Sequence, residues 1–409
     1  MRTRHLLGAV AGATALFLLP PSVARAAGTP VAPTVVEDDA TYTIGSAGKV
    51  TFVEPVGSPV PSFFVYETGN GAITKITANK RRVTVSIVPT SPVNGLQVWA
   101  VEADGTFTPT TTTFVHAVYP PPFADQDLTG DGKPDLLTVG GATGLPPGVW
   151  LTAGKAGKGR LRTPATLIAS VDGWPAPDFD GAQTLSGTFT GTSFNDLFVY
   201  YPSGLNAGLS MIASSFDNGG PVDEAGASAM PSGTMSDLNG DNPTQVANAY
   251  DSAGTHNAYP DLFAVNGDRT NGYTLDYYPN SDGTGAYFTA NPTPLPTPTG
   301  GTDWNSWHLA SKLLPNGTAL LLSNPTTGAL YLWESVTYDG TTLRYTSYRL
   351  AATWPAAAAA LQLSQDASGA PLIWAVSSGG AATAYLVSHL STTGTATLKA
   401  QPTQPLLLP

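Results

Sequence analysis

The sequence of 409 residues contains no cysteine, so the protein can form no disulfide bond and offers no cysteine for lipid attachment. Basic residues are also scarce: 18 lysines and arginines stand against 29 aspartates and glutamates, which gives a formal net charge of −11. This balance argues against nucleic acid as a partner, because phosphates require a basic surface. With 42% hydrophobic residues, the chain is too apolar to be disordered. Its stability must come from a packed core, alone or together with bound metal.

Catalytic sequence motifs are absent as well. The chain contains no H-E-x-x-H, G-x-S-x-G or P-loop sequence. Of the five histidines, His308 has one carboxylate nearby in the sequence, Asp303, at no spacing typical of catalysis. We therefore assign no catalytic residues and do not expect an enzyme.

Long apolar runs are missing except at the N-terminus. Residues 6–19 are uncharged and mostly hydrophobic; two arginines precede them, and a small-x-small sequence ending at Ala26 follows. The run is too short to span a bilayer, whereas this order of basic, apolar and small residues is typical of a signal peptide. We predict a signal peptide over residues 1–27, cleaved after Ala26 or Ala27, and a secreted protein without a membrane span in the mature chain. An uncleaved anchor is the alternative.

Glycine and proline are abundant, with 44 and 36 residues, and predict many turns between short strands. Between residues 30 and 119, apolar and polar residues alternate between turn signals, which favours an immunoglobulin-like β-sandwich. In the segment after residue 95, Leu96, Val98 and Ala100 share one face and Trp99 lies on the other. The proline run at 120–122 then indicates a stiff linker. The segments that carry the alternation are 49–55, 62–67, 81–88, 96–105 and 111–118.

From residue 123 to 409 the chain repeats a pattern of two apolar segments joined by a glycine-rich turn. The repeats start at residues 135, 196, 261, 319 and 371, so they are 61, 65, 58 and 52 residues apart. Repeated β-hairpin units of this size indicate a β-propeller, because each sheet must stack on its neighbours to bury its faces. Five blades are the first choice; six blades or an incomplete ring stay open. We interpret the Pro/Thr-rich residues 291–301 as a surface connection, and residues 395–400 as the outer strand of the last repeat.

The first repeat is preceded by a loop rich in aspartate. Counting from its first ligand, oxygen-bearing side chains occupy positions one, three, five and nine, and the residue at position seven can offer its carbonyl. Such a set of hard oxygen ligands suits calcium. An EF-hand would require a glutamate at position twelve, which is Thr138. The alternative is a cluster of aspartates that only stabilise a turn. The predicted ligands are Asp127, Thr129, Asp131, Lys133 and Asp135.

The sequence D-x-T-G-D-G-x-x-D-L in this loop resembles the FG-GAP/VCBS repeat of integrin α-subunit propellers and of many secreted bacterial proteins. The resemblance extends over about residues 123–390 and implies a propeller with structural Ca²⁺ bound in such loops. A second loop begins in the same way, with Asp237, Asn239 and Asp241, which we predict as further metal ligands. Its ninth position is Gln245, or Asp261 after an insertion.

The other repeats match the motif less well. The loop at 188–196 keeps only its final aspartate and carries threonines at the other ligand positions. The fourth repeat has no acidic loop, and the fifth keeps Asp366 but ends in Leu372 at the closing position. We expect no tight metal site in the loop at 188–196.

This combination predicts a secreted, non-enzymatic binding or adhesion protein whose extracellular ligand, a glycan or a surface protein, is unknown. A lectin-like propeller that stacks exposed aromatic rings on sugars is the alternative, and a secreted hydrolase is a further one. Propellers also use aromatic residues between blades, and we expect core packing for most of the aromatic side chains here: Tyr200, Tyr201, Tyr277, Tyr278, Trp304, Trp307, Trp333, Trp354 and Trp374.

Overall fold

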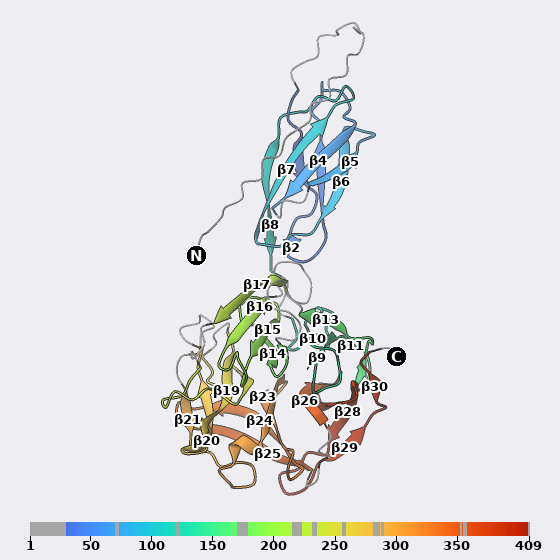
Figure 1. Cartoon of the computed structure of the whole chain (residues 1–409). Helices are drawn as coiled ribbons and strands as arrows, with labels where there is room; N and C mark the ends of the chain where they lie inside the picture. Colours follow the sequence, from blue (N-terminus) through green and yellow to red (C-terminus); the bar gives the residue numbers. More distant parts are fainter. Residues whose placement is uncertain are drawn as a thin grey trace. The chain divides into compact units, whose positions relative to one another are not determined.

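The computed structural model describes an all-β protein (Figure 1). The described residues are 30–69, 73–119, 123–169, 179–214, 223–230, 235–255, 259–280, 287, 290–351, 354 and 358–407. The predicted signal peptide and the prolines at 120–122 lie outside them. Within the described part, no helix is long and apolar enough to cross a membrane.

The chain divides into two compact units. The first contains residues 30–38, 49–86 and 95–114, and the second contains 39–48, 87–94 and everything from 115 onward. The predicted domain limits, 30–119 and 123–409, stay a prediction.

The N-terminal strands form two sheets with the orders β1-β3-β6 and β2-β8-β7-β4-β5. Phe52 on β3 packs against Phe64 and Tyr66 on β4, with ring centroids 5.9 and 5.3 Å apart, so the two sheets share a core. The strands are β1 (Thr34–Glu37), β2 (Tyr42–Thr43), β3 (Gly48–Val53), β4 (Phe63–Thr68), β5 (Ile73–Thr77), β6 (Arg82–Ile87), β7 (Val93–Val101) and β8 (Thr111–Val118).

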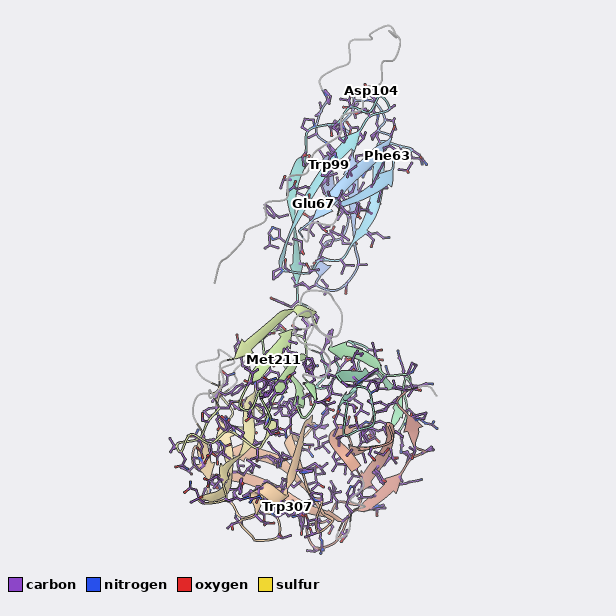
Figure 2. The ribbon with its side chains drawn as sticks, viewed as in Figure 1. Phe63, Glu67, Trp99, Asp104, Met211 and Trp307 are labelled. Atoms are coloured by element: carbon purple, nitrogen blue, oxygen red, sulfur yellow. The ribbon has the colours of Figure 1, made fainter. Side chains whose placement is uncertain are left out.

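The alternation of apolar and polar residues in β7 places one face of the strand in the core, as predicted. Leu96, Val98 and Ala100 are buried, because a strand places every second side chain on the same face. Trp99 points to the opposite face and is half-buried (Figure 2).

The second unit contains five antiparallel sheets in chain order. The first is β9 (Leu136–Val139), β10 (Val149–Thr152) and β13 (Thr166–Ala169), with the short pair β11 (Gly154–Lys155) and β12 (Arg160–Leu161) beside it in the sequence. The second is β14 (Gln183–Gly187), β15 (Asp196–Tyr200), β16 (Ser210–Ser214) and β17 (Asp223–Met230). The third is β18 (Gln245–Tyr250), β19 (Asp261–Asp268), β20 (Gly272–Tyr278) and β21 (Asn291–Thr293).

The fourth sheet is β22 (His308–Leu314), β23 (Gly317–Asn324), β24 (Ala329–Tyr338) and β25 (Leu343–Ala351), preceded by the 3-10 turn η2 (Trp304–Ser306). The fifth is β26 (Ala358–Gln365), β27 (Pro371–Ser377), β28 (Ala381–Ser388) and β29 (Thr397–Ala400), and β30 (Gln404–Pro405) also pairs with β28. Figure 1 shows these sheets following one another within the unit.

Contacts between the first strands of these sheets close a cycle. β14 contacts β18, β18 contacts β22, and β22 contacts β26. β9 contacts both β14 and β26, so the last sheet returns to the first.

The five sequence repeats correspond to two adjacent strands of each sheet. In the last four sheets these are the second and third strands, for example β15 and β16, whereas β9 is the first strand of its sheet. The first sheet therefore has three strands in the described residues where the others have at least four. The outer strand β29 of the fifth sheet confirms the prediction for residues 395–400. Residues 291–301 differ from the prediction, because 291–293 form β21 and pair with β20 instead of only connecting two repeats.

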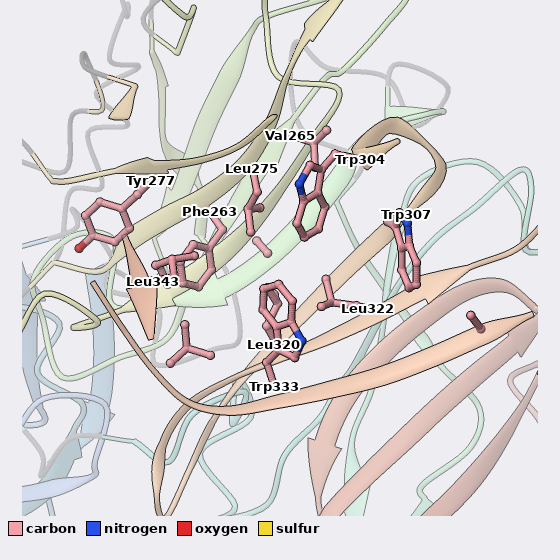
Figure 3. Packing of buried hydrophobic residues seen from close by; sticks show 14 residues of the cluster. Phe263, Val265, Leu275, Tyr277, Trp304, Trp307, Leu320, Leu322, Trp333 and Leu343 are labelled. Carbon is pink, nitrogen blue, oxygen red and sulfur yellow. The ribbon is translucent and has the colours of Figure 1, made fainter. Parts of the chain in front are cut away.

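Aromatic side chains fill the cores between neighbouring sheets, and all nine named above are buried, as expected. Between the third and fourth sheets, Trp333 meets Trp304 edge-on, with ring centroids 5.9 Å apart (Figure 3). Trp333 also stacks on Tyr345 of β25, with ring centroids 3.7 Å apart. Such packing requires both sheets, because neither could cover these rings alone.

Candidate functional site

The loop from 127 to 135 brings its three aspartates together. One carboxylate oxygen from each of Asp127, Asp131 and Asp135 lies within 4.8 Å of those of the other two. Asp127 and Asp135 are buried, and Asp131 is half-buried. No other three histidine or acidic residues meet in this way in the part of the chain that the structure describes.

Backbone amides hold the two buried carboxylates in place. Asp135 Oδ2 accepts hydrogen bonds from the N–H groups of Leu128 and Thr129, each at 2.9 Å, and its Oδ1 accepts one from Gly154 at 2.8 Å. Asp127 accepts from the N–H groups of the residues at 131 and 132, at 3.0 and 2.7 Å. The carboxylates are therefore fixed in position before any cation binds.

The charge of the cluster is only partly compensated by the protein. Asp131 Oδ2 lies 3.0 Å from an Arg162 nitrogen and 3.4 Å from Lys133 Nζ. Desolvation by burial raises the pKa of Asp127, and it raises the pKa of Asp135 to about 6. Buried carboxylates this close together would gain from a bound cation, since it removes their mutual repulsion.

The two remaining predicted ligands, Thr129 and Lys133, form hydrogen bonds to aspartates of the same loop. The Thr129 hydroxyl donates to Asp135 Oδ1 at 3.4 Å, and the Lys133 N–H donates to Asp131 Oδ1 at 3.0 Å. The structure thus brings together the three carboxylates of the predicted set, while Thr129 and Lys133 support two of them.

The turn itself recurs in loops with fewer carboxylates. In each case an N–H group donates to the side-chain oxygen four residues earlier, across a glycine with positive φ. These pairs are Asp131 to Asp127 at 3.0 Å, Asp241 to Asp237 at 2.9 Å, Gly301 to Thr297 at 3.1 Å and Ala370 to Asp366 at 3.2 Å. The glycines are Gly130, Gly240, Gly300 and Gly369, with φ between 73° and 86°.

The loop from 188 to 196 closes in the same way with a single carboxylate. Thr190 donates to Asp196 Oδ2 through its N–H and its hydroxyl, at 2.6 and 2.8 Å, as Thr129 does to Asp135. The turn therefore forms without aspartates at the positions of Asp127 and Asp131.

The second predicted site is less complete. Asp237 Oδ1 accepts from the N–H groups of Asn239 and Asp241, at 2.8 and 2.9 Å. Both residues considered for its ninth position have other roles. Gln245 is the first residue of β18, and the Asp261 carboxylate accepts a hydrogen bond from the hydroxyl of Tyr277. Metal binding by Asp237, Asn239 and Asp241 stays a prediction.

Asp125, two residues before the metal loop, has a role that sequence reasoning missed. Its Oδ2 lies 2.9 Å from Lys312 Nζ and accepts hydrogen bonds from the Leu313 N–H at 3.0 Å and from the Tyr250 hydroxyl at 2.9 Å. The Lys312 side chain is fully buried. The ion pair joins the segment before the first sheet to the fourth sheet, and the hydrogen bond from Tyr250 joins it to the third.

Glutamines connect neighbouring sheets around the cycle. Each uses its side-chain oxygen to accept a hydrogen bond from a backbone N–H of the next first strand. The pairs are Gln183 with Val246 at 2.8 Å, Gln245 with Leu309 at 3.0 Å, and Gln362 with Leu137 at 3.0 Å. The only sequence signal is an isolated glutamine in the segment before a repeat.

The first strands of the five sheets enclose a cavity of about 640 Å³. Its wall is formed mainly by β9, β14, β18, β22 and β26, together with Gln126, single residues of β20 and η2, two residues of β23 and a few loop residues. His308 is part of this wall, and desolvation lowers the pKa of its imidazole. No aspartate or glutamate is among the described residues that line the cavity, so His308 has no acidic partner there.

No protein-family model and no curated protein matches this sequence. Among solved structures, the chain is similar to a provisionally assigned phosphatase from Bacteroides thetaiotaomicron, with 11% identity, a TM-score of 0.30, and coverage of 86% of this chain and 68% of that one. It is also similar to auxiliary nutrient binding proteins from Bacteroides thetaiotaomicron and Bacteroides ovatus. The first has 11% identity, a TM-score of 0.28 and coverage of 91% and 70%. The second has 10% identity, a TM-score of 0.29 and coverage of 88% and 84%. All three TM-scores are low, and the function of this chain is therefore argued from its own geometry.

Proposed function

We propose that this chain is a secreted, non-enzymatic binding protein, in which an immunoglobulin-like sandwich precedes a five-bladed propeller stabilised by calcium. The closed cycle of contacts between five consecutive sheets supports the propeller. The basic, apolar and small-residue order of residues 1–27 supports secretion.

The calcium proposal rests on one observation. The loop at 188–196 forms its turn with Asp196 alone, whereas the loop at 127–135 places two further carboxylates within 4.8 Å of Asp135. Those two carboxylates are unnecessary for the turn, and their proximity costs electrostatic energy when no cation is bound. Hard oxygen ligands in this number suit Ca²⁺.

Asp127, Asp131 and Asp135 would hold the ion, and their loop leads directly into β9. Calcium there would stabilise the first sheet, which among the described residues has fewer strands than the others. At a calcium concentration of one hundred times the Kd, such a site adds about 2.7 kcal/mol to the free energy of unfolding. A secreted chain without disulfides has few other ways to gain this much free energy of unfolding.

The test is calcium binding by isothermal titration calorimetry, together with the melting temperature in the presence and absence of chelator. We expect chelation to lower the melting temperature of the wild type, and Asp131→Ala to bind calcium more weakly and to melt like the chelated protein. Thr192→Ala is the matched control, because Thr192 occupies the same position in the loop at 188–196. Equal effects of the two substitutions, or a melting curve that ignores chelator, would contradict the calcium proposal.

Secretion is tested separately by mass spectrometry of the protein recovered from culture medium. An N-terminus at Ala27 or Gly28 is the expected result, whereas a membrane-bound chain that retains Met1 would contradict it.

A further inference from the structure

Arg162 reaches the candidate metal loop from outside that loop. It directly follows β12, and its N–H donates to the Ala153 carbonyl at 2.8 Å, which holds its backbone beside the β11–β12 pair. Its guanidinium lies 3.0 Å from Asp131 Oδ2, and Lys133 Nζ lies 3.4 Å from the same oxygen. One of the three carboxylates that would hold calcium is therefore paired with two cations of the protein itself.

The two oxygens of Asp131 have different surroundings. Oδ1 accepts a hydrogen bond from the Lys133 N–H at 3.0 Å. Oδ2 accepts no hydrogen bond, has almost no contact with solvent and has the two cations as its neighbours. Because Oδ2 is free of backbone hydrogen bonds, it is the Asp131 oxygen available to a metal ion. An ion that binds there must take the place of the protein's own cations.

Arg162 can leave Asp131 at little cost. Its side chain is 57% exposed, and an ion pair at such a position contributes little to stability because water screens it. A guanidinium that turns into solvent uncovers Oδ2, whereas one that stays repels the incoming ion, because like charges repel each other at this short range. In both cases the positive charge of Arg162 lowers the affinity of the loop for a divalent cation.

We propose that Arg162 competes with calcium for Asp131 and thereby sets the calcium affinity of the loop. The inference rests on the proposed calcium site and assigns it a residue that weakens binding. The charge of the ligand set tunes calcium affinity, and extracellular modules bind calcium with a Kd of roughly 10⁻⁴–10⁻³ M. Arg162 shifts the loop towards this weak range, so that it fills only where calcium is abundant.

The test is isothermal titration calorimetry of the mature chain with calcium chloride, after a chelator has removed bound metal. Arg162→Gln removes the charge and keeps a polar side chain at an exposed position. We expect this variant to bind calcium roughly three- to tenfold more tightly than the wild type, as estimated for one unit charge close to a divalent ion in water. The gain should shrink between about 20 mM and about 500 mM sodium chloride, because salt screens an exposed charge.

Arg160→Gln is the matched control. Arg160 is exposed, lies two residues earlier on β12 and forms no ion pair in the part of the chain that the structure describes. The control thus removes the same net charge without affecting the contact with Asp131, and its Kd should stay close to that of the wild type. Equal Kd values of the two variants, or weaker calcium binding by Arg162→Gln, would overturn the proposal.

Melting temperatures separate competition from a purely structural role of Arg162. Without calcium, Arg162→Gln should melt slightly below the wild type, because Asp131 loses a counter-ion. With saturating calcium the difference should vanish or reverse, because the variant gains more stability from the ion that it binds more tightly. The same loss with and without calcium would show that Arg162 only stabilises the loop, and would overturn the proposal.

Failure of this proposal is distinguishable from failure of the proposed calcium site. Calcium binding by the wild type with an unchanged Kd in Arg162→Gln would overturn the competition alone. Absence of calcium binding in both the wild type and Arg162→Gln would overturn the calcium site, and the competition with it.

Discussion

Lys312 shows how much a single residue can contribute when its charge is buried. Its ammonium group has been removed from water, and Asp125 compensates it at 2.9 Å. Removal of one partner of a buried pair leaves the other charge without compensation.

We expect Lys312→Met to lower the free energy of unfolding by about 3–5 kcal/mol, measured by chemical denaturation. Arg344→Met is the control, because Arg344 pairs with Asp339 at 3.0 Å but its side chain is 74% exposed, where water screens the pair. The control should unfold close to the wild type. A similar loss in both variants would show that the buried pair has no special weight.

Glu54 and Glu102 are buried acidic residues of the sandwich. Desolvation raises the pKa of both above the usual value of 4.5. The charge of Glu102 raises the pKa of Glu54 further, and the charge of Asp104 raises that of Glu102. A raised carboxyl pKa means that the folded state binds the proton more tightly than the unfolded state. The contribution of Glu54 to stability is thus fully present below pH 4.5 and is lost as the pH rises through its raised pKa.

Glu54→Gln should therefore gain stability relative to the wild type as the pH increases. Melting temperatures of both proteins at pH 4 and pH 8 would measure this, and the difference should favour the variant more at pH 8. A pH-independent difference for Glu54→Gln would contradict the prediction.

At the scale of strands, glutamine side chains form hydrogen bonds between neighbouring sheets, whereas the backbone hydrogen bonds act within each sheet. The first strand of a sheet has neighbours on one side only, so its outer backbone groups need other partners. Gln362 supplies them for β9, accepting from Leu137 at 3.0 Å and donating to the Asp135 carbonyl at 2.7 Å. The same side chain thereby reaches the end of the candidate metal loop.

Replacement of Gln245 by leucine tests this role. The change removes the acceptor for the Leu309 N–H and the donor to the Trp307 carbonyl, while the side chain keeps a similar size. We expect a loss of about 1–3 kcal/mol in the free energy of unfolding, since buried backbone groups lose their partners. Gln401→Leu, whose side chain bonds only to the nearby Lys399 carbonyl, should cost much less. Equal losses would mean that the link between sheets is dispensable.

At the scale of the whole second unit, the C-terminal segment contacts both the fifth sheet and the first sheet. β30 pairs with β28 of the fifth sheet, and the Leu406 carbonyl accepts from Ala165, which directly precedes β13 of the first sheet, at 2.6 Å. The Leu406 side chain is fully buried among residues of both sheets. These contacts hold the first and last sheets together.

Leu406→Ala should therefore destabilise the unit by about 2–5 kcal/mol, as expected for a buried leucine. Hydrogen exchange should also quicken in β13 and β28, because the two sheets separate more easily. Leu205→Ala is the control, as Leu205 is fully exposed in a turn of the second sheet. Unchanged exchange in β13 would show that the C-terminal segment does not close the unit.

The strands and the acidic loop followed from the sequence because both depend on residues close together in the chain. Alternation in β7 assigned its buried face, and the five repeats marked adjacent strand pairs in five sheets. The spacing of Asp127, Asp131 and Asp135 indicated that they would meet, because a glycine turn brings such positions together. The sequence also distinguished this loop from the one at 188–196, which carries threonines at the positions of Asp127 and Asp131.

Only the tertiary structure decided how these pieces join. The first strands of the last four sheets, β14, β18, β22 and β26, carry no repeat motif. Gln404 accepts a hydrogen bond from the Leu161 N–H, 243 residues away in the chain. No local sequence pattern predicts either feature. The partner of Asp125, the links made by the glutamines and the neutral cavity likewise depend on which segments become neighbours when the cycle of sheets closes. A local sequence pattern sets the faces and turns of each strand, whereas contacts between distant segments arise only from burying all the sheets together.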